Sequence, residues 1–127
     1  RRTIIFEKAK KLGSHLVALG HHRDDNIQTL LMNLLHKGEF CGLLPKIYMK
    51  KYEITIIRPL ILASEADIIR FSQYHGYKNI TCQCLNSDNS MRKKTEELIS
   101  EIEKLYPNIR VNLSHAALNY GSDKANR

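Results

Sequence analysis

No hydrophobic run in the 127-residue sequence approaches the roughly 18–20 residues that a membrane-spanning helix needs. The sequence also has no signal-peptide pattern, no internal repeat and no low-complexity segment. Its three cysteines are an odd number and do not suggest the disulfide framework of a small secreted domain. These absences argue against a membrane protein or a secreted one and predict a cytoplasmic protein.

Acidic side chains are in the minority, with 13 Asp and Glu against 20 Lys and Arg, and the formal net charge is +7. Such an excess suits a polyanionic partner, RNA or DNA first. It is equally compatible with a basic protein that binds no nucleic acid, so charge alone leaves both readings open. The hydrophobic content of 43% is enough for a packed core and excludes a disordered tail.

The spacing of apolar residues predicts helices that alternate with strands, which is typical of an α/β fold with parallel strands and crossover helices. The predicted helices cover residues 3–13, 24–37, 64–74, 90–105 and 108–119; the extended segments cover 15–19 and 43–63, the latter with a turn at Lys50–Lys51. Only one clear parallel strand and one further candidate are present, fewer than a parallel sheet needs. Because the chain also opens on Arg1 and not Met, it is expected to be a segment of a longer protein.

For three of the predicted helices, the spacing of apolar residues predicts which side chains are buried. The expected buried residues are Ile5, Ala9 and Leu12 in the first; Ile27, Leu30, Leu31, Leu34 and Leu35 in the second; and Leu98, Ile99, Ile102 and Leu105 in the helix at 90–105.

The most informative segment is Leu19–Thr29, which reads L-G-H-H-R-D-D-N-I-Q-T. A predicted strand ends, Gly20 lets the backbone turn, and polar residues follow where the next helix begins. In open α/β sheets ligands bind at this carboxyl edge, and a helix N-terminus there favours phosphate. Asp24 and Asp25 could hold Mg²⁺, which prefers oxygen ligands. Alternatively, the two carboxylates only cap the helix, and His21 and His22 are surface residues.

The segment from Gly20 to Thr29 resembles a signature of the PP-loop ATP pyrophosphatases, G-H-(H/N)-x-D-D-x-x-(E/Q)-T. The form with Arg23 before the two aspartates is typical of the tRNA 2-thiocytidine synthetases. The resemblance extends from Arg1 to about Leu105. It is supported by Arg1–Arg2, Asn33, Pro45–Lys46, Ile57–Leu60, Glu65, Asp67–Ile68 and Arg70–Phe71.

This resemblance implies the C-terminal part of a PP-loop, adenine-nucleotide alpha-hydrolase-like domain, followed by a helical extension. The implied enzyme adenylates a tRNA cytidine with ATP and Mg²⁺, after which sulfur displaces AMP. The implied partners are tRNA, ATP and a sulfur donor (a cysteine desulfurase or a persulfide carrier), with a homodimer as a further possibility. The implied catalytic residues are Asp24 and Asp25, and the implied nucleotide-binding residues are Gly20, His21, His22 and Arg23.

Two parts of the family pattern do not occur in the sequence: the S-G-G-x-D-S loop that grips pyrophosphate, and a C-x-x-C pair that precedes Arg1–Arg2 in relatives. The 127-residue chain is therefore expected to be inactive alone. The expected domain organisation is the end of the PP-loop domain at 1–77, a cysteine-bearing loop with a helical extension at 78–120, and a flexible tail at 121–127.

The family also implies a 4Fe-4S cluster held by cysteine thiolates. Where relatives read P-C-x-L-C-G-S, this sequence reads T-C-Q-C-L-N-S at Thr81–Ser87, so Cys82 matches the first cysteine and Cys84 lies one position short of the second. The resemblance favours Cys82 over Cys84 as a ligand, although both could be ordinary thiols. Cys41 matches no motif cysteine and is interpreted as structural.

Three other functions stay open at this point: lysidine synthesis, uridine thiolation, and a non-catalytic RNA-binding module. A tRNA-binding track is a further possibility, with Tyr48 and Tyr52 available for base stacking, although most of its members could equally form a solvated face. The basic residues concerned are Arg1, Arg2, Lys8, Lys10, Lys11, Lys46, Lys50, Lys51, Arg92, Lys93 and Lys94.

Overall fold

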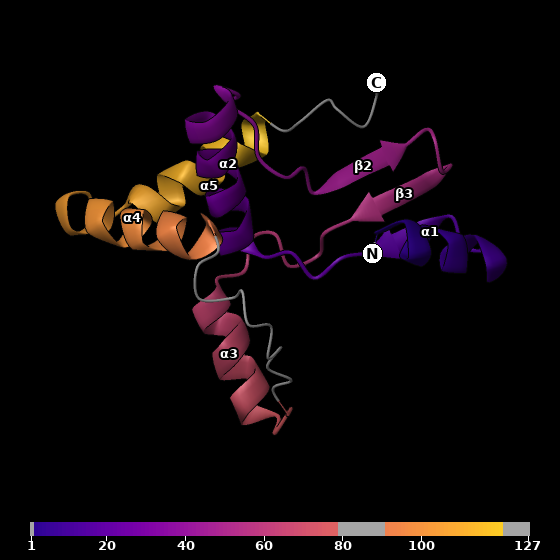
Figure 1. Ribbon diagram of the computed structural model, residues 1–127. Coiled ribbons are helices and arrows are strands. Elements are labelled where there is room, and N and C mark those ends of the chain that lie inside the picture. The colour runs from indigo at the N-terminus through magenta and orange to yellow at the C-terminus, as the bar shows by residue number, and fades with distance from the viewer. Residues whose placement is uncertain (1, 79–90, 121–127) are drawn as a thin grey trace.

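A computed structural model describes residues 2–78 and 91–120 (Figure 1). The described elements are α1 (Arg2–Lys11), β1 (Leu16–Ala18), α2 (Arg23–Lys37), β2 (Lys46–Met49), β3 (Ile54–Ile57), α3 (Glu65–Tyr74), α4 (Met91–Leu105) and α5 (Ile109–Asn119). They agree in type and order with the sequence predictions. None of the described helices is long and apolar enough to cross a membrane.

The three described strands form one mixed sheet in the order β1-β3-β2. β1 pairs with β3 in parallel, with Leu16 opposite Thr55 and Ala18 opposite Ile57. β2 and β3 form an antiparallel pair, and the turn that joins them contains Lys50 and Lys51. The predicted parallel pair is confirmed, and α2 belongs to the crossover between its two strands, as α/β topology requires.

The sheet and α1 share one hydrophobic core. Phe6 of α1 packs with Val17, Ile54 and Ile56 of the strands, and its ring lies 5.0 Å from that of Tyr52. The prediction for α1 was wrong in part, because Ile5 and Leu12 are exposed. Tyr52 is half-buried at the edge of this core.

A second core lies between α2, α4 and α5, where Ile27 and Leu31 of α2 pack against Ile99 of α4. The prediction for α2 holds for its first two turns, in which Leu30 is also fully buried, but Leu34 and Leu35 are exposed. For α4 it was wrong at two positions, since Leu98 and Leu105 are exposed as well. Of the four predicted positions of α4, Ile99 is fully buried and Ile102 is half-buried, and Thr95 is buried in addition.

Helix α3 projects away from the other elements, with none of its residues buried (Figure 1). Its start is fixed by Ser64, whose hydroxyl accepts a hydrogen bond from the Asp67 amide at 3.1 Å. Hydrogen bonds from the side chains of Ser64 and Arg70 lower the pKa of Asp67 below its ordinary value. Gly76 follows the helix with a φ of 66°, a left-handed conformation that favours glycine.

Gly42 lies at the closest approach between the chain after α2 and helix α5. A Cβ atom at this position would lie 2.5 Å from Asn26 Oδ1 and 2.7 Å from the Cβ of Ala117. Both neighbours are fully buried. The contact therefore leaves no room for a side chain.

Replacing Gly42 with Ala is expected to lower the free energy of unfolding by about 1–3 kcal/mol, because an added methyl group overpacks a closed interface. Urea unfolding followed by circular dichroism measures the change. Gly20→Ala is the matched control, since a Cβ atom there meets nothing within 4 Å. Equal stability of the two variants would contradict the close packing of Gly42.

Candidate functional site

The motif residues lie at the carboxyl edge of the parallel strand pair. β1 ends at Ala18 and β3 at Ile57, and the Leu19 amide donates a hydrogen bond to the Ile57 carbonyl at 2.9 Å. Gly20 to Arg23 and Arg58 therefore leave the sheet at the same edge, and α2 begins there. Ligands of open α/β sheets bind at this position, and we call the region the nucleotide edge after the role that the sequence resemblance implies for it.

Gly20 is not required for the backbone turn that the sequence suggested. It is not among the described glycines with positive φ, which are Gly13, Gly38 and Gly76. A Cβ atom on Gly20 would meet nothing within 4 Å. The space beside this backbone is open, so a ligand can approach it closely.

His21 is held by a buried arginine from the neighbouring strand. Arg58 is 7% exposed, and its Nε donates to His21 Nδ1 at 3.3 Å while its Nη1 donates to the Leu44 carbonyl. A neutral His21 that accepts at Nδ1 carries its proton on Nε2. Sequence reasoning did not select Arg58 as a site residue. The feature that could have identified it is a single cationic residue directly after a buried strand.

His22 caps α2 together with Asp25. His22 Nδ1 accepts from the Asp25 amide at 3.4 Å, and Asp25 Oδ2 accepts from the His22 amide at 3.1 Å, which completes a capping box. The reading in which an aspartate of the pair caps the helix is therefore confirmed for Asp25. The same capping role places the Asp25 carboxylate at the nucleotide edge.

Asp24 is the buried member of the acidic pair, with a side chain only 9% exposed. Its Oδ2 accepts from the Glu65 amide at 2.8 Å, and its Oδ1 accepts from Arg110 Nη1 at 3.2 Å. Asp24 thus joins the start of α2 to the start of α3 and to α5. Both of its oxygens already accept hydrogen bonds from the protein.

Arg110 on α5 forms ion pairs with carboxylates from two other helices, α2 and α4. Besides Asp24, its Nη2 donates to Glu96 at 2.6 Å and its Nε to Glu103 at 2.9 Å. Burial opposes the charged form, but the hydrogen bonds with Glu96 and Glu103 outweigh it and raise the pKa of Arg110 above its ordinary value. The sequence gives no signal for this contact, because Arg110 and Asp24 are 86 residues apart.

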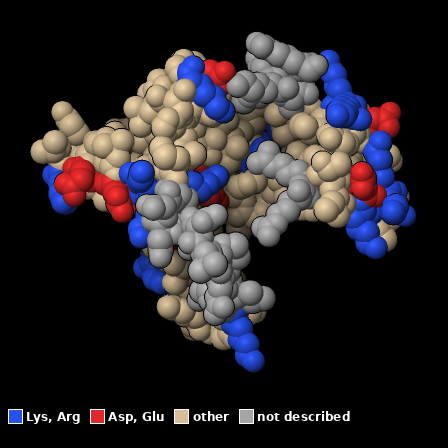
Figure 2. All heavy atoms as spheres, viewed as in Figure 1, with Lys and Arg blue, Asp and Glu red and all other residues tan. Residues whose placement is uncertain are grey.

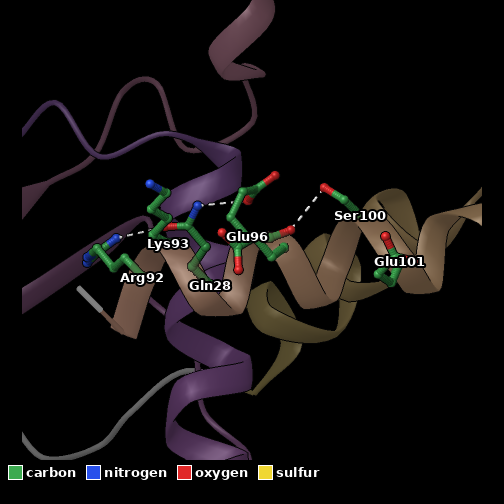
Figure 3. A pocket seen from close by; sticks show the side chains of 7 residues that line it. Gln28, Arg92, Lys93, Glu96, Ser100 and Glu101 are labelled. Atoms are coloured by element: carbon green, nitrogen blue, oxygen red, sulfur yellow. Dashed lines mark hydrogen bonds between the residues drawn. The ribbon is translucent and has the colours of Figure 1, made fainter. Parts of the chain in front are cut away.

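Asp25 is the more accessible carboxylate, with a side chain 24% exposed. Its Oδ1 accepts from Arg92 Nη1 of α4 at 3.0 Å. The same Arg92 nitrogen lies 3.2 Å from Gln28 Oε1, and Gln28 Nε2 donates to Glu96 at 2.9 Å. Gln28, Arg92 and Glu96 line a shallow surface pocket between α2 and α4 (Figure 3).

The described residues contain no group of three or more His, Cys, Asp or Glu side chains that could hold a metal ion. A magnesium ion often binds through one or two carboxylates and completes its shell with phosphates and water. Asp25 fits that role, because it is partly exposed and each of its oxygens retains a lone pair. Asp24 fits that role less well, because its side chain is only 9% exposed; its oxygens, like those of Asp25, each accept one hydrogen bond from the protein.

Arg23 adds a candidate anion contact to the nucleotide edge. Its Nε is buried and has no hydrogen-bond partner among the described residues. A buried cationic donor without a partner is costly, and a phosphate oxygen would satisfy it. At the start of α2, however, the Arg23 and Asp25 amides already have protein acceptors, Ala63 and His22.

Cys82 and Cys84 lie outside the described residues, so their predicted role as metal ligands stays a prediction. Cys41 is half-buried and free of disulfides, and its sulfur lies 3.4 Å from the Asn33 amide nitrogen. Asn33 also donates to the Cys41 carbonyl at 2.9 Å. These contacts agree with a structural role for Cys41.

A sequence profile of the PP-loop domain matches residues 1–95, which include β1, the motif and all of α2 and α3. The chain belongs to the PP-loop family. Its nucleotide edge is thus formed by elements within the matched region, whereas Arg110 lies beyond it.

Curated PP-loop relatives are similar over most of the chain. A tRNA-cytidine(32) 2-sulfurtransferase from Dechloromonas aromatica is 42% identical over 108 residues, which are 84% of this chain and 38% of the relative. The Legionella pneumophila (strain Corby) protein of that name is 38% identical over 117 residues, which are 91% of this chain and 41% of the relative. The chain therefore spans about two fifths of the length of these relatives.

Among solved structures, the fold is similar to that of the U34-tRNA thiolase NcsA from Methanococcus maripaludis, solved with its 4Fe-4S cluster. The TM-score is 0.73, and the match covers 92% of this chain and 40% of the thiolase chain. The sequence identity is 22%, so the similarity supports the fold.

Proposed function

We propose that the protein containing this chain is an ATP-dependent tRNA sulfurtransferase that converts a tRNA cytidine to 2-thiocytidine. The observation that carries the proposal is the 42% identity to a tRNA-cytidine(32) 2-sulfurtransferase across a region that includes the whole His-His-Arg-Asp-Asp motif. In the proposed reaction, ATP adenylates the cytidine carbonyl oxygen and pyrophosphate leaves; sulfur then displaces AMP.

The geometry of the nucleotide edge suggests a division of roles. Asp25 is the carboxylate placed to meet the nucleotide and its Mg²⁺, because it is the accessible member of the pair. Arg23 and the open space beside Gly20 suit the phosphates. Asp24 acts indirectly, as the buried group that holds α3 and α5 to the start of α2. His21 and His22 shape the edge through Arg58 and the helix cap.

A basic patch at one end of the molecule supports RNA as the substrate. Figure 2 shows lysine and arginine side chains gathered where α1 ends and the β2–β3 turn lies. The exposed members at this end are Lys8, Lys10, Lys11, Lys50 and Lys51. Lys10 is paired with Glu53 at 3.3 Å, and the patch as a whole retains a positive excess that phosphates can neutralise.

The proposal includes a 4Fe-4S cluster, which the thiolase of similar fold also contains, and assigns to it the handling of sulfur in this protein. Its support within this chain is the position of Cys82 and Cys84 in the sequence, since Cys41 is engaged with Asn33. The sulfur donor, a cysteine desulfurase or a persulfide carrier, and a homodimeric assembly belong to the same proposal.

The direct test is expression of the gene that contains this sequence in a bacterium lacking its own tRNA-cytidine(32) 2-sulfurtransferase. Mass spectrometry of tRNA nucleosides is expected to show restored 2-thiocytidine. Lysidine or a thiolated uridine in its place would assign the protein to another tRNA-modifying branch of the family. Tight tRNA binding without any modified nucleoside would indicate an RNA-binding module.

A further inference from the structure

Arg92 connects the nucleotide edge to helix α4. It is the second residue of α4, and its guanidinium contacts two residues of α2, Asp25 and Gln28, that are 67 and 64 positions away in the sequence. Asp25 and Gln28 are both motif residues, one helical turn apart on the same face of α2. One side chain of α4 therefore contacts two members of the motif, Asp25 and Gln28, of which Figure 3 shows Gln28 beside Arg92.

The contacts of Arg92 fix the orientation of the Asp25 carboxylate. Oδ2 of Asp25 accepts from the His22 amide at 3.1 Å, and Oδ1 accepts from Arg92 at 3.0 Å. Two donors on opposite oxygens leave the carboxylate plane little freedom to rotate. Among the described residues Arg92 is the donor to Oδ1, so in its absence the helix cap is what restrains the carboxylate.

These contacts belong to a continuous polar network that links the two aspartates. The network runs from Asp25 through Arg92, Gln28 and Glu96 to Arg110, and it ends at Asp24. It crosses from α2 to α4, back to α2, then to α4 and α5. The helical pair α4–α5 is thereby attached to both carboxylates of the motif.

Because Arg92 is exposed, we expect its contacts to orient Asp25 without contributing much to the stability of the fold. The Arg92 side chain is 46% exposed and that of Asp25 is 24% exposed. Solvent screens such a pair, and exposed ion pairs contribute little to the free energy of unfolding. Loss of the pair should therefore leave the fold intact while it releases the Asp25 carboxylate.

We infer that Arg92 is a positioning residue of the proposed sulfurtransferase. Through Asp25 and Gln28 it orients the accessible carboxylate at the nucleotide edge, and it fixes the start of the helix that directly follows the sequence segment carrying Cys82 and Cys84. This inference rests on the proposed function. It adds to that function a residue of α4 that acts through others and need not touch substrate.

The test is Arg92→Gln in the protein that contains this chain, assayed for thiolation of tRNA with ATP. The kcat for 2-thiocytidine formation is expected to fall roughly 10–100-fold, as when a group that orients an active-site residue is lost. The KM for tRNA is expected to stay unchanged, and the melting temperature to stay within about 4 °C. Arg92→Lys, which keeps the charge near Asp25, is expected to recover part of the kcat.

Lys104→Gln is the matched control, because Lys104 forms an exposed ion pair with Glu101 on the same helix. It is expected to leave both kinetic constants unchanged. An unchanged kcat in Arg92→Gln, together with an inactive Asp25→Asn, overturns the inference. A raised KM for tRNA at normal kcat also overturns it, since Arg92 would then be a phosphate contact.

Hydrogen exchange on the 127-residue chain tests the structural half of the inference without any assay of activity. Arg92→Gln is expected to speed amide exchange in the first two turns of α4, whereas Lys104→Gln leaves them unchanged. Equal exchange in the two variants overturns the inference. If the wild-type protein forms no 2-thiocytidine, the proposed function fails, and the exchange result still decides whether Arg92 fixes the start of α4.

Discussion

Replacing Asp25 with Asn is expected to lower 2-thiocytidine formation roughly 10²–10³-fold, the usual effect of losing a contact that stabilises developing charge in a water-poor site. Stability should change little, because the amide oxygen of Asn can still accept from the His22 amide. The lost ion pair with Arg92 is half-exposed and weak. The measurements are nucleoside mass spectrometry of tRNA and thermal melting of the same purified variant.

Asp24→Asn is the comparison variant. It tests whether Asp24 acts as a buried structural group while Asp25 acts as an accessible carboxylate at the nucleotide edge. Both Asp24 oxygens face donors, the Glu65 amide and Arg110, and an amide group has only one acceptor oxygen. Its NH₂ group would therefore face a donor in a buried site, which costs about 1–3 kcal/mol. We expect Asp24→Asn to melt earlier and Asp25→Asn not to. Near-normal thiolation in Asp25→Asn would mean that Asp25 only caps the helix.

The sequence was sufficient to predict the elements that form the nucleotide edge. Strand β1 is a short apolar run between a helix stop and Gly20, and α2 has regular helical spacing after two acidic residues. Both signals are local, because a strand or a helix start depends on residues within a few positions of each other. The segment from Leu19 to Thr29 could therefore be placed correctly before any contact was known.

The partners of the motif could not be predicted in the same way. Arg92 and Arg110 approach Asp25 and Asp24 only because α4 and α5 pack on α2, and no local pattern encodes that packing. The same reason explains the errors in α4, where helical spacing marked Leu98 and Leu105 as core residues. Periodicity identifies a potentially buried stripe, but only the neighbouring helices decide how much of it is covered.

The interpretation of the acidic pair changed for a related reason. Adjacent in sequence, Asp24 and Asp25 looked equivalent as magnesium ligands. Successive residues of a helix point about 100° apart, so one carboxylate faces the α3–α5 junction and the other faces α4 and solvent. Their exposures of 9% and 24% follow from that difference.

Replacing Arg110 with Met is expected to lower the free energy of unfolding by roughly 3 kcal/mol, because it leaves carboxylates without their shared cation. The Arg110 side chain is 17% exposed and Asp24 is 9% exposed, so Asp24 would stay buried, with the Glu65 amide as its remaining hydrogen-bond donor and His22 Nδ1 3.9 Å away. Glu96 and Glu103 are 37% and 39% exposed, and water can partly solvate them. For that reason we place the cost at the lower end of the range for a broken buried pair. Urea unfolding of the 127-residue chain measures it.

Two further variants show whether this cost comes from the charge, from its geometry or merely from the loss of an arginine. Arg110→Lys keeps the cation but cannot reach three carboxylates with one ammonium group, so it should recover only part of the stability. Arg70→Met removes an exposed arginine that pairs with Asp67 on α3, and it should change the stability far less than Arg110→Met, because solvent screens the pair. If Arg110→Met were no more destabilising than Arg70→Met, α5 would not depend on this cluster. The junction of α2, α4 and α5 would then depend on apolar contacts such as those of Ile27, Leu31 and Ile99 with Leu113 of α5.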